Sequence, residues 1–259
     1  MVNQTDRQRE ILAFTQAHGH CSVTDLAAKF RVTQETIRRD LKSLEEEGRL
    51  ERVHGGAIVT EREFLAEQPF DASERAHVPE KDAIAAAALR FIPGGSASIL
   101  LDAGTTTALL ASKLAQSYSG QRWTIMTNSL PGGMALSVGG VPGVHILGGA
   151  MRTFTRAVVG EPAISTLHDL QADVAFLGTN GLSAWHGAST PDPSEAAMKR
   201  AMVRAAKRVV VLCDSSKFDA DFLVTFCDFE DIDDLITDSA PPEPLAAALA
   251  NNEVDVTFA

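Results

Sequence analysis

Cysteine is scarce in this 259-residue sequence, where Cys21, Cys213 and Cys227 are widely separated and form no C-x-x-C pair. Three scattered cysteines exclude the disulfide framework of a small secreted domain. Long apolar runs are also lacking. No stretch approaches the ~18 uninterrupted apolar residues of a membrane span, and the first ten residues lack the apolar core of a secretion signal. We therefore expect a cytoplasmic protein that does not associate with membranes.

Positive charge is in deficit, with 23 Lys and Arg against 34 Asp and Glu and a formal net charge of −11. An acidic average argues against nucleic acid as a partner, but the charge is unevenly distributed. Basic and acidic residues balance in residues 1–58, so residues 59–259 carry the whole excess. This asymmetry predicts two domains with different tasks, at 1–58 and 80–259. The polar stretch at 59–79 is interpreted as a linker.

Three helical patterns follow one another in residues 1–58. Apolar residues recur at helical spacing in residues 7–18, 22–30 and 33–48. Ser22 or Thr24 can cap the second helix, and Thr33 can cap the third. These patterns predict a small domain of three helices.

The third predicted helix has an apolar face and a basic face. At about 100° per residue, Ile37, Leu41 and Leu44 lie together and are expected to pack inward. Asp40 lies nearer to this apolar seam, and we interpret it as a structural partner. The outer positions carry Glu35, Thr36, Arg38, Arg39, Lys42 and Ser43. Such a surface suits the major groove of DNA; the alternative is the solvated exterior of any small helical bundle.

Two segments of this region, TQETIRRDL (33–41) and RVHGGA (52–57), resemble the signature of the DeoR family of bacterial repressors. The resemblance implies a winged helix-turn-helix that binds double-stranded operator DNA, with residues 34–42 as recognition helix and 49–59 as wing. The two glycines at 55–56 independently indicate a turn. The candidate DNA-binding residues are Thr33, Gln34, Glu35, Thr36, Arg38, Arg39, Lys42, Arg52 and His54.

Short apolar runs alternate with helical patterns from residue 80 onward. The candidate strands are residues 97–101, 124–127, 144–147, 173–177, 208–213 and 234–237. Alternation of strands and helices predicts an α/β domain with a largely parallel sheet covered on both faces. Ligands of such sheets bind at the carboxyl ends of the strands.

Polar loops follow several of these strands. Gly104 permits a tight turn before Thr105 and Thr106, which open a helix, so this loop can bind an anion at a helix N-terminus; the alternative is a plain helix cap. Lys217 follows the strand at 208–213. Further polar residues after predicted strands are Asp102, Thr127, Asn128, Arg152 and Gly178. Glu195 and Lys199 are four residues apart on a helix, where the alternative is a surface salt bridge.

In order, these elements match the sensor domain of the DeoR family, which is similar in fold to ribose-5-phosphate isomerase. The resemblance implies a phosphorylated sugar as effector, with its phosphate on residues 104–106, Lys217 and Lys199. It suggests Asp102, Asn128 and Glu195 for sugar hydroxyls or structural support. The candidate effector residues are Asp102, Gly104, Thr105, Thr106, Thr127, Asn128, Arg152, Gly178, Glu195, Lys199 and Lys217.

The rival hypothesis is a sugar-phosphate isomerase or deaminase with an added DNA-binding domain. The D-G-x-D-E and D-G-H segments of those enzymes are absent, and the corresponding stretch reads LGTNGLSAWHGAS. Glu195 remains available as a general base. We predict a non-enzymatic repressor of a sugar-utilisation operon, without cofactor or metal. We also expect a homo-oligomer, dimer or tetramer, because paired recognition helices on two half-sites provide useful affinity.

Overall fold

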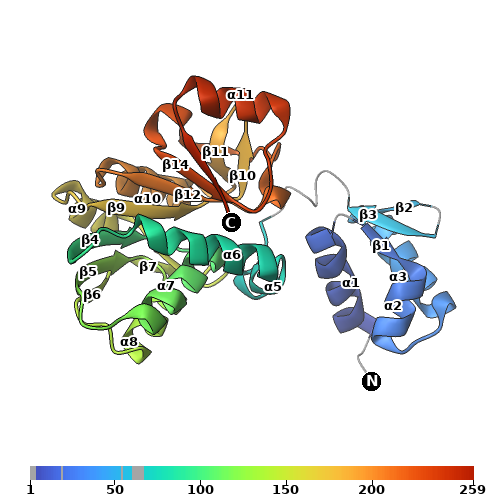
Figure 1. Cartoon of the computed structure of the whole chain (residues 1–259). Helices are drawn as coiled ribbons and strands as arrows, with labels where there is room; N and C mark the ends of the chain where they lie inside the picture. The colour runs from blue at the N-terminus through green and yellow to red at the C-terminus, as the bar shows by residue number, and fades with distance from the viewer. Residues whose placement is uncertain (1–3, 19, 54, 60–66) are drawn as a thin grey trace. The chain divides into compact units, whose positions relative to one another are not determined.

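The computed structural model describes residues 4–18, 20–53, 55–59 and 67–259, and the chain divides into two compact units, Met1–Glu67 and Gln68–Ala259 (Figure 1). The boundary differs from the predicted linker, residues 59–79. Residues 68–79 belong to the larger unit, where they form α5 (Phe70–Arg75) and the start of α6 (Val78–Ala88). The reason is Phe70, which is only 4% exposed and anchors this polar stretch. The rest of the predicted linker, from 60 to 66, lies outside the described residues.

In its described residues, the smaller unit contains three helices and a three-stranded antiparallel sheet. Its elements are α1 (Gln4–His18), β1 (His20–Ser22), α2 (Val23–Phe30), α3 (Gln34–Glu46), β2 (Leu50–Val53) and β3 (Gly56–Val59), with the strand order β1-β3-β2. The predicted caps are present, because the Ser22 hydroxyl accepts from the backbone of α2 and the Thr33 hydroxyl from that of α3. The β2–β3 hairpin stands where the resemblance placed the wing. The first strand, β1, was not predicted.

A seven-stranded parallel sheet forms the centre of the larger unit. Its strands are β4 (Ser96–Leu101), β5 (Arg122–Thr127), β6 (Val144–Ile146), β9 (Val174–Gly178), β12 (Val209–Leu212), β14 (Asp234–Thr237) and β15 (Asp255–Phe258). Their order in the sheet is β15-β14-β12-β9-β4-β5-β6, and every neighbouring pair is parallel. The sequence predicted six of these strands but not β15.

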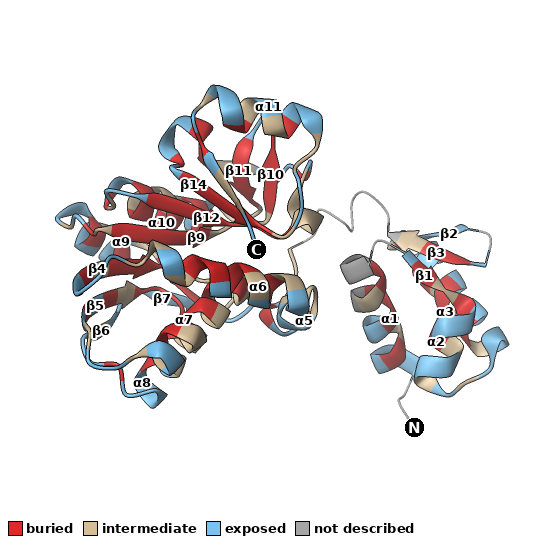
Figure 2. Cartoon of the chain, viewed as in Figure 1, coloured by how far each residue is buried: buried red, intermediate tan, exposed pale blue. Residues whose placement is uncertain are grey.

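Helices cover both faces of this sheet. The helices α6, α7 (Thr105–Ser117) and α8 (Leu130–Val138) pack into one apolar cluster, and α9 (Glu161–His168), α10 (Pro193–Arg204) and α11 (Glu243–Asn251) into another. Successive residues of a strand point to opposite faces; Phe176 of β9 accordingly joins the first cluster and Leu177 the second. The buried positions therefore follow the strands and the inward sides of the helices (Figure 2).

Two small antiparallel sheets flank the large one. One is the hairpin of β7 (Ala150–Arg152) and β8 (Ala157–Val159), and the other contains β10 (Gly181–Ser183), β11 (Gly187–Thr190) and β13 (Val224–Cys227). Short helical turns are η1 (Leu89–Phe91), η2 (Ser215–Lys217) and η3 (Phe229–Asp231). Among the described residues, no helix is long and apolar enough to cross a membrane.

Candidate functional site

The outer face of α3 is basic and exposed, as the helical spacing predicted. The side chains of Arg38, Arg39 and Lys42 are 52%, 78% and 65% exposed, whereas Ile37 and Leu41 are buried in the core. Each basic side chain forms an exposed ion pair with an acidic neighbour on the same helix: Glu35 lies 3.7 Å from Arg38 and 3.8 Å from Arg39, and Glu46 lies 3.6 Å from Lys42. Exposed pairs of this kind are weak, so these three cationic side chains are available to a ligand.

Asp40 has the structural role that its position predicted. It is 1% exposed, and its carboxylate accepts from Arg7 of α1 through Nε at 2.6 Å and Nη2 at 3.2 Å. Such a bidentate pair is strong and geometrically specific. The hydrogen bond that Arg7 donates to Asp40 raises the pKa of Arg7 above its ordinary value. The pair therefore fixes the orientation of α3 against α1.

The β2–β3 hairpin is tied to α3 and to β1. The backbone N–H of Arg52 donates to Glu45 of α3 at 3.3 Å, and the Arg52 guanidinium lies 3.7 Å from the same carboxylate. Gly56 is required by close approach, because a Cβ there would lie 1.9 Å from the carbonyl oxygen of Cys21. His54, another candidate for DNA contact, lies outside the described residues.

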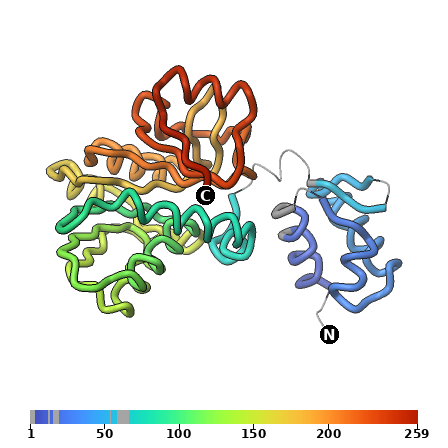
Figure 3. Tube along the Cα trace, viewed as in Figure 1, coloured from blue at the N-terminus to red at the C-terminus, as the bar shows by residue number. Residues whose placement is uncertain are grey.

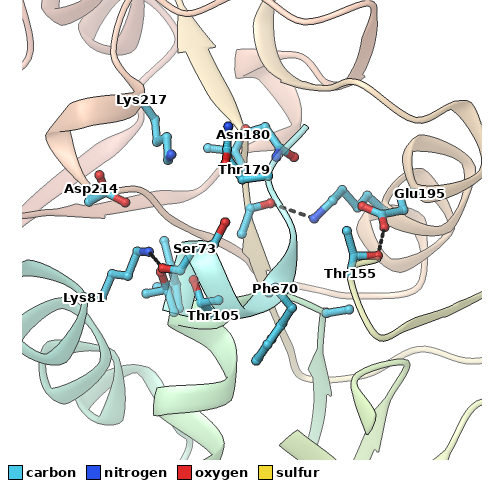
Figure 4. A pocket seen from close by; sticks show the side chains of 17 residues that line it. Phe70, Ser73, Lys81, Thr105, Thr155, Thr179, Asn180, Glu195, Asp214 and Lys217 are labelled. Carbon is cyan, nitrogen blue, oxygen red and sulfur yellow. Dashed lines mark hydrogen bonds between the residues drawn. The ribbon is translucent and has the colours of Figure 1, made fainter. Parts of the chain in front are cut away.

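A polar cleft lies at the carboxyl ends of β4, β9 and β12, which are neighbours in the sheet (Figure 4). Seven of the eleven predicted effector residues line it, namely Gly104, Thr105, Thr106, Gly178, Glu195, Lys199 and Lys217. The other lining residues are Gln68, Phe70, Ser73, Lys81, Ala103, Thr155, Thr179, Asn180, Leu212 and Asp214. The cleft therefore stands where a parallel sheet predicts a ligand site.

The remaining four predicted residues lie outside this lining. Asp102 is buried beneath it, the Thr127 hydroxyl accepts from the backbone of Ser129 at 2.9 Å, and the Asn128 amide donates to Val158 at 3.2 Å. Arg152 binds Glu195 instead of pointing at a ligand. Each of these four side chains therefore contacts other protein groups and does not line the cleft.

Lys199 is paired within the protein, which changes its predicted role. Its ammonium bonds the Asp102 carboxylate and donates to the Gly178 carbonyl at 2.9 Å. Burial raises the pKa of Asp102, while the ammonium of Lys199 opposes that shift. Because the charge of Lys199 is matched by Asp102, this lysine contributes less to an anionic ligand than the sequence suggested.

One end of the cleft is cationic. Lys81 and Lys217 lie on either side of Asp214, beside Thr105 at the start of α7 (Figure 4). Burial opposes ionisation of Asp214, but Lys217, a hydrogen bond from Ser216 and then Lys81 together hold the pKa of this carboxyl below its usual value. The first backbone N–H groups of a helix have no partner within it and attract anions. Two lysines, one carboxylate and a helix N-terminus leave a net positive charge.

Lys81 is the functional candidate that sequence analysis missed. It is 3% exposed, and burial lowers its pKa to about 8, with Lys217 acting in the same direction and Asp214 and Glu80 against it. Its Nζ donates to the carbonyl of Ser73 at 2.6 Å. The spacing of residues 81, 84, 85 and 88 is helical and could have indicated that Lys81 is buried, because these four residues share the buried side of α6.

The opposite end of the cleft offers acceptors for hydroxyl groups. Glu195, in the first turn of α10, accepts from the Thr155 hydroxyl and from Arg152, whose guanidinium also lies 3.2 Å from Asp192. Between the two ends lies Asn180, whose side-chain carbonyl accepts from the Thr190 hydroxyl at 2.9 Å (Figure 4). Glu195 is thus held in place and keeps acceptor capacity. The cleft can bind a molecule that is anionic at one end and hydroxylated at the other.

Comparisons with known proteins agree with both units. The family description "DeoR-like helix-turn-helix domain" matches residues 7–63, and "DeoR C terminal sensor domain" matches residues 76–239. The transcriptional regulator GlpR of Haloferax volcanii is 35% identical over 234 residues, which cover 90% of this chain and 89% of that protein. The chain belongs to the DeoR family. It is a DNA-binding transcriptional regulator with a helix-turn-helix and a sensor domain.

The chain is also similar to a second regulator and, over part of its length, to a solved structure. The glycerol-3-phosphate regulon repressor of Escherichia coli is 28% identical over 98% of this chain and 99% of its own length. Among solved structures, ribose 5-phosphate isomerase A of Methanocaldococcus jannaschii is 18% identical, with a TM-score of 0.40 over 53% of each chain. The chain thus spans about half the length of that isomerase. Because the Haloferax volcanii and Escherichia coli relatives are named as a transcriptional regulator and a repressor, the comparisons favour the regulator hypothesis over the sugar-phosphate isomerase or deaminase.

Arg39→Ala is expected to weaken binding of this DeoR-family regulator to its operator by about 1–3 kcal/mol, the cost of losing one base-edge contact, because this exposed side chain is a candidate for such a contact. Binding to random DNA should change much less. Gel-shift titrations on an operator selected from random DNA, and on random DNA itself, measure both quantities. Arg204→Ala, in the larger unit, is the control for loss of one positive charge. An equal loss on both DNAs would assign Arg39 to phosphate instead.

Proposed function

We propose that this protein represses a sugar-utilisation operon and that a phosphorylated sugar bound in the cleft changes its affinity for DNA. The observation that carries the proposal is the pairing of Lys81 and Lys217 with the N-terminus of α7. A phosphate dianion gains charge-assisted hydrogen bonds from such a set of donors. Glu195 at the other end, and Asn180 between the two ends, suit the hydroxyl groups of a sugar (Figure 4). The regulon named for the Escherichia coli relative, glycerol 3-phosphate, is consistent with a phosphorylated effector.

On the DNA side, we propose that α3 enters the major groove and that the β2–β3 hairpin contacts the backbone or the minor groove. The candidate contacts are Thr33, Gln34, Glu35, Thr36, Arg38, Arg39, Lys42, Arg52 and His54. Thr33 and Thr36 are joined by a 2.9 Å hydrogen bond at the start of the helix. Helix starts bind phosphate through their backbone N–H groups, so this end of α3 is assigned to the DNA backbone.

The decisive experiment screens ligands and then tests their effect on DNA binding. Thermal unfolding is measured with glycerol 3-phosphate, fructose 1-phosphate and fructose 6-phosphate, each beside its unphosphorylated counterpart. A ligand that binds the folded state raises the unfolding temperature. The expected result is stabilisation by at least one phosphorylated compound, which also changes the dissociation constant of the selected operator. Equal stabilisation by the unphosphorylated counterpart would refute the phosphate site.

We further propose a homo-oligomer, dimer or tetramer, assembled through the larger unit. A single recognition helix covers few base pairs, and two-fold symmetric operators require two copies. Sedimentation velocity at micromolar concentration should give at least twice the mass of the chain, both free and bound to operator DNA. A monomer under both conditions would contradict this prediction.

Effector binding is expected to take up protons near pH 8. Lys81, with its pKa of about 8, faces Asp214, Lys217 and Glu80, and a phosphate dianion favours its charged form. Affinity should therefore be greatest below pH 8 and should fall as the pH rises through 8. At pH 8.5, calorimetry in buffers of different ionisation enthalpy should detect uptake of up to about 0.8 of a proton. Lys81→Met should abolish the uptake; an uptake that persists in this variant would contradict the assignment.

A further inference from the structure

The first residues of the larger unit are part of the wall of the cleft. The larger unit begins at Gln68, and both Gln68 and Ser73 line the cleft together with Phe70 (Figure 4). The chain then continues from α5 into α6, as its trace shows (Figure 3). The residue before Gln68 is Glu67, the last of the DNA-binding unit. A ligand in the cleft is therefore next to the residues with which the larger unit begins, directly after the DNA-binding unit in the chain.

The first contact that holds α5 against the rest of the larger unit is a hydrogen bond from Lys81. Its ammonium donates to the carbonyl of Ser73, near the end of the helix, at 2.6 Å. An ammonium has three N–H donors, and Lys81 also lines the cleft, so it can donate to Ser73 and to a ligand together. An anion in the cleft stabilises the charged lysine, and a charged donor makes the stronger hydrogen bond. The bond that holds α5 is thus sensitive to what fills the cleft.

The second set of contacts that holds α5 in place comes from the turn between β7 and β8. The backbone N–H of Phe70 donates to the carbonyl of Phe154 at 2.9 Å, and Arg156 binds Asp71 at 2.7 Å. The guanidinium of Arg156 also lies over the ring of Phe70, 4.8 Å from its centroid. These contacts attach α5 to the hairpin on the side of the helix that carries its buried aromatic residue.

The same turn reaches the cleft on its other side. Thr155, between the two residues that bind α5, donates its hydroxyl to Glu195 in the cleft, and Arg152 at the start of the turn binds the same carboxylate. Both sets of contacts with α5 therefore depend on the cleft. Lys81 lines it, and Phe154 and Arg156 are the sequence neighbours of Thr155, which also lines it.

We propose that α5 is a latch, held more firmly to the larger unit when the cleft contains a phosphorylated ligand. The phosphate and the Ser73 carbonyl share the Lys81 ammonium, and the firmly held helix restricts the DNA-binding unit that precedes it in the chain. A ligand shifts an equilibrium only by its difference in affinity for two states. The latch supplies this difference, because part of the cleft wall is present only while α5 is in place. The inference rests on the proposed phosphate site.

Hydrogen exchange of the full-length protein tests the latch, with inorganic phosphate as probe and sodium chloride at equal ionic strength as control. Phosphate should slow exchange in residues 68–76 about tenfold, because opening of α5 then costs more. It should also protect the start of α7. Lys81→Met should speed exchange of α5 without phosphate about tenfold. Lys217→Met is the matched control, because it also removes a cleft lysine but leaves the bond to Ser73.

The outcomes separate the latch from the site on which it depends. Protection of the α7 start with unchanged exchange in α5 would refute the latch and leave the phosphate site standing. Protection of neither segment would refute the phosphate site, and the latch with it. Exchange of α5 at the unaltered rate in Lys81→Met would also refute the latch.

A second variant tests the connection to DNA without touching the cleft lining. Arg156→Asn removes the contacts with Asp71 and Phe70, and asparagine tolerates the left-handed backbone at this position, where φ is +58°. Phosphate should still protect the start of α7. The ratio of operator dissociation constants with and without phosphate should move toward one. A ratio equal to that of the unaltered protein, or no effect of phosphate on operator binding by the unaltered protein, would refute the latch.

Discussion

Replacing Asp40 by alanine is expected to destabilise the DNA-binding unit by about 3–5 kcal/mol, which is comparable with the whole stability of a small domain. The loss comes from Arg7, whose guanidinium would remain largely buried without the carboxylate that now binds it at 2.6 Å. Operator binding should be lost, while the sensor domain should keep its ligand. Hydrogen exchange in α1–α3 and calorimetry with the effector measure the two effects separately.

A double variant provides the control for Asp40. Replacing both charges, with Arg7→Met and Asp40→Leu, removes the pair without leaving a buried charge behind, and such replacements are often neutral or stabilising. Exchange rates in α1–α3 should therefore return toward those of the unaltered protein. If the double variant is as unstable as Asp40→Ala alone, packing around this site matters more than the charge of Arg7.

Lys217→Ala is expected to weaken effector binding about ten- to a hundredfold, or about 1.5–3 kcal/mol, while DNA binding persists. The physical reason is loss of one of the two lysines beside the α7 N-terminus, where a phosphate dianion needs charge-assisted donors. Calorimetry with the effector found by screening measures the change in dissociation constant.

Lys207 offers a matched control, because it precedes β12 whereas Lys217 follows it, so the two lysines lie near opposite ends of one strand. Lys207 binds Asp173 at 2.9 Å and does not line the cleft. Lys207→Ala should leave effector affinity unchanged. Equal dissociation constants for Lys217→Ala and the unaltered protein would move the phosphate away from the cationic end of the cleft.

Local patterns predicted much of the fold because burial leaves a regular trace in the sequence. The apolar runs that became β9 and β12 are buried on both faces, so they read as continuous hydrophobic segments. The outer face of α3 follows from the helical period alone. By contrast, β15 is half exposed and begins with Asp255, so its apolar signal is weak.

The cleft was only partly predictable because long-range pairing decides which side chains face a ligand. Glu195 and Lys199 are one turn apart on α10, a spacing at which they could have paired with each other. In the structure Glu195 binds Arg152 and Lys199 binds Asp102, partners that are 43 and 97 residues away. The polar composition of residues 59–79 also gave no indication of α5, because a single buried residue, Phe70, decides where that segment packs.

The position of the cleft residues along the chain has a consequence during translation. The buried core of the DNA-binding unit extends from Ile11 to Ala57, whereas the cleft lining extends from Gln68 to Lys217. Domains generally fold as they leave the ribosome, N-terminal first. The DNA-binding unit is therefore synthesised in full before the first lining residue is added. A truncated product that ends between Ala57 and Gln68 contains the whole core of the DNA-binding unit but none of the residues that line the ligand cleft.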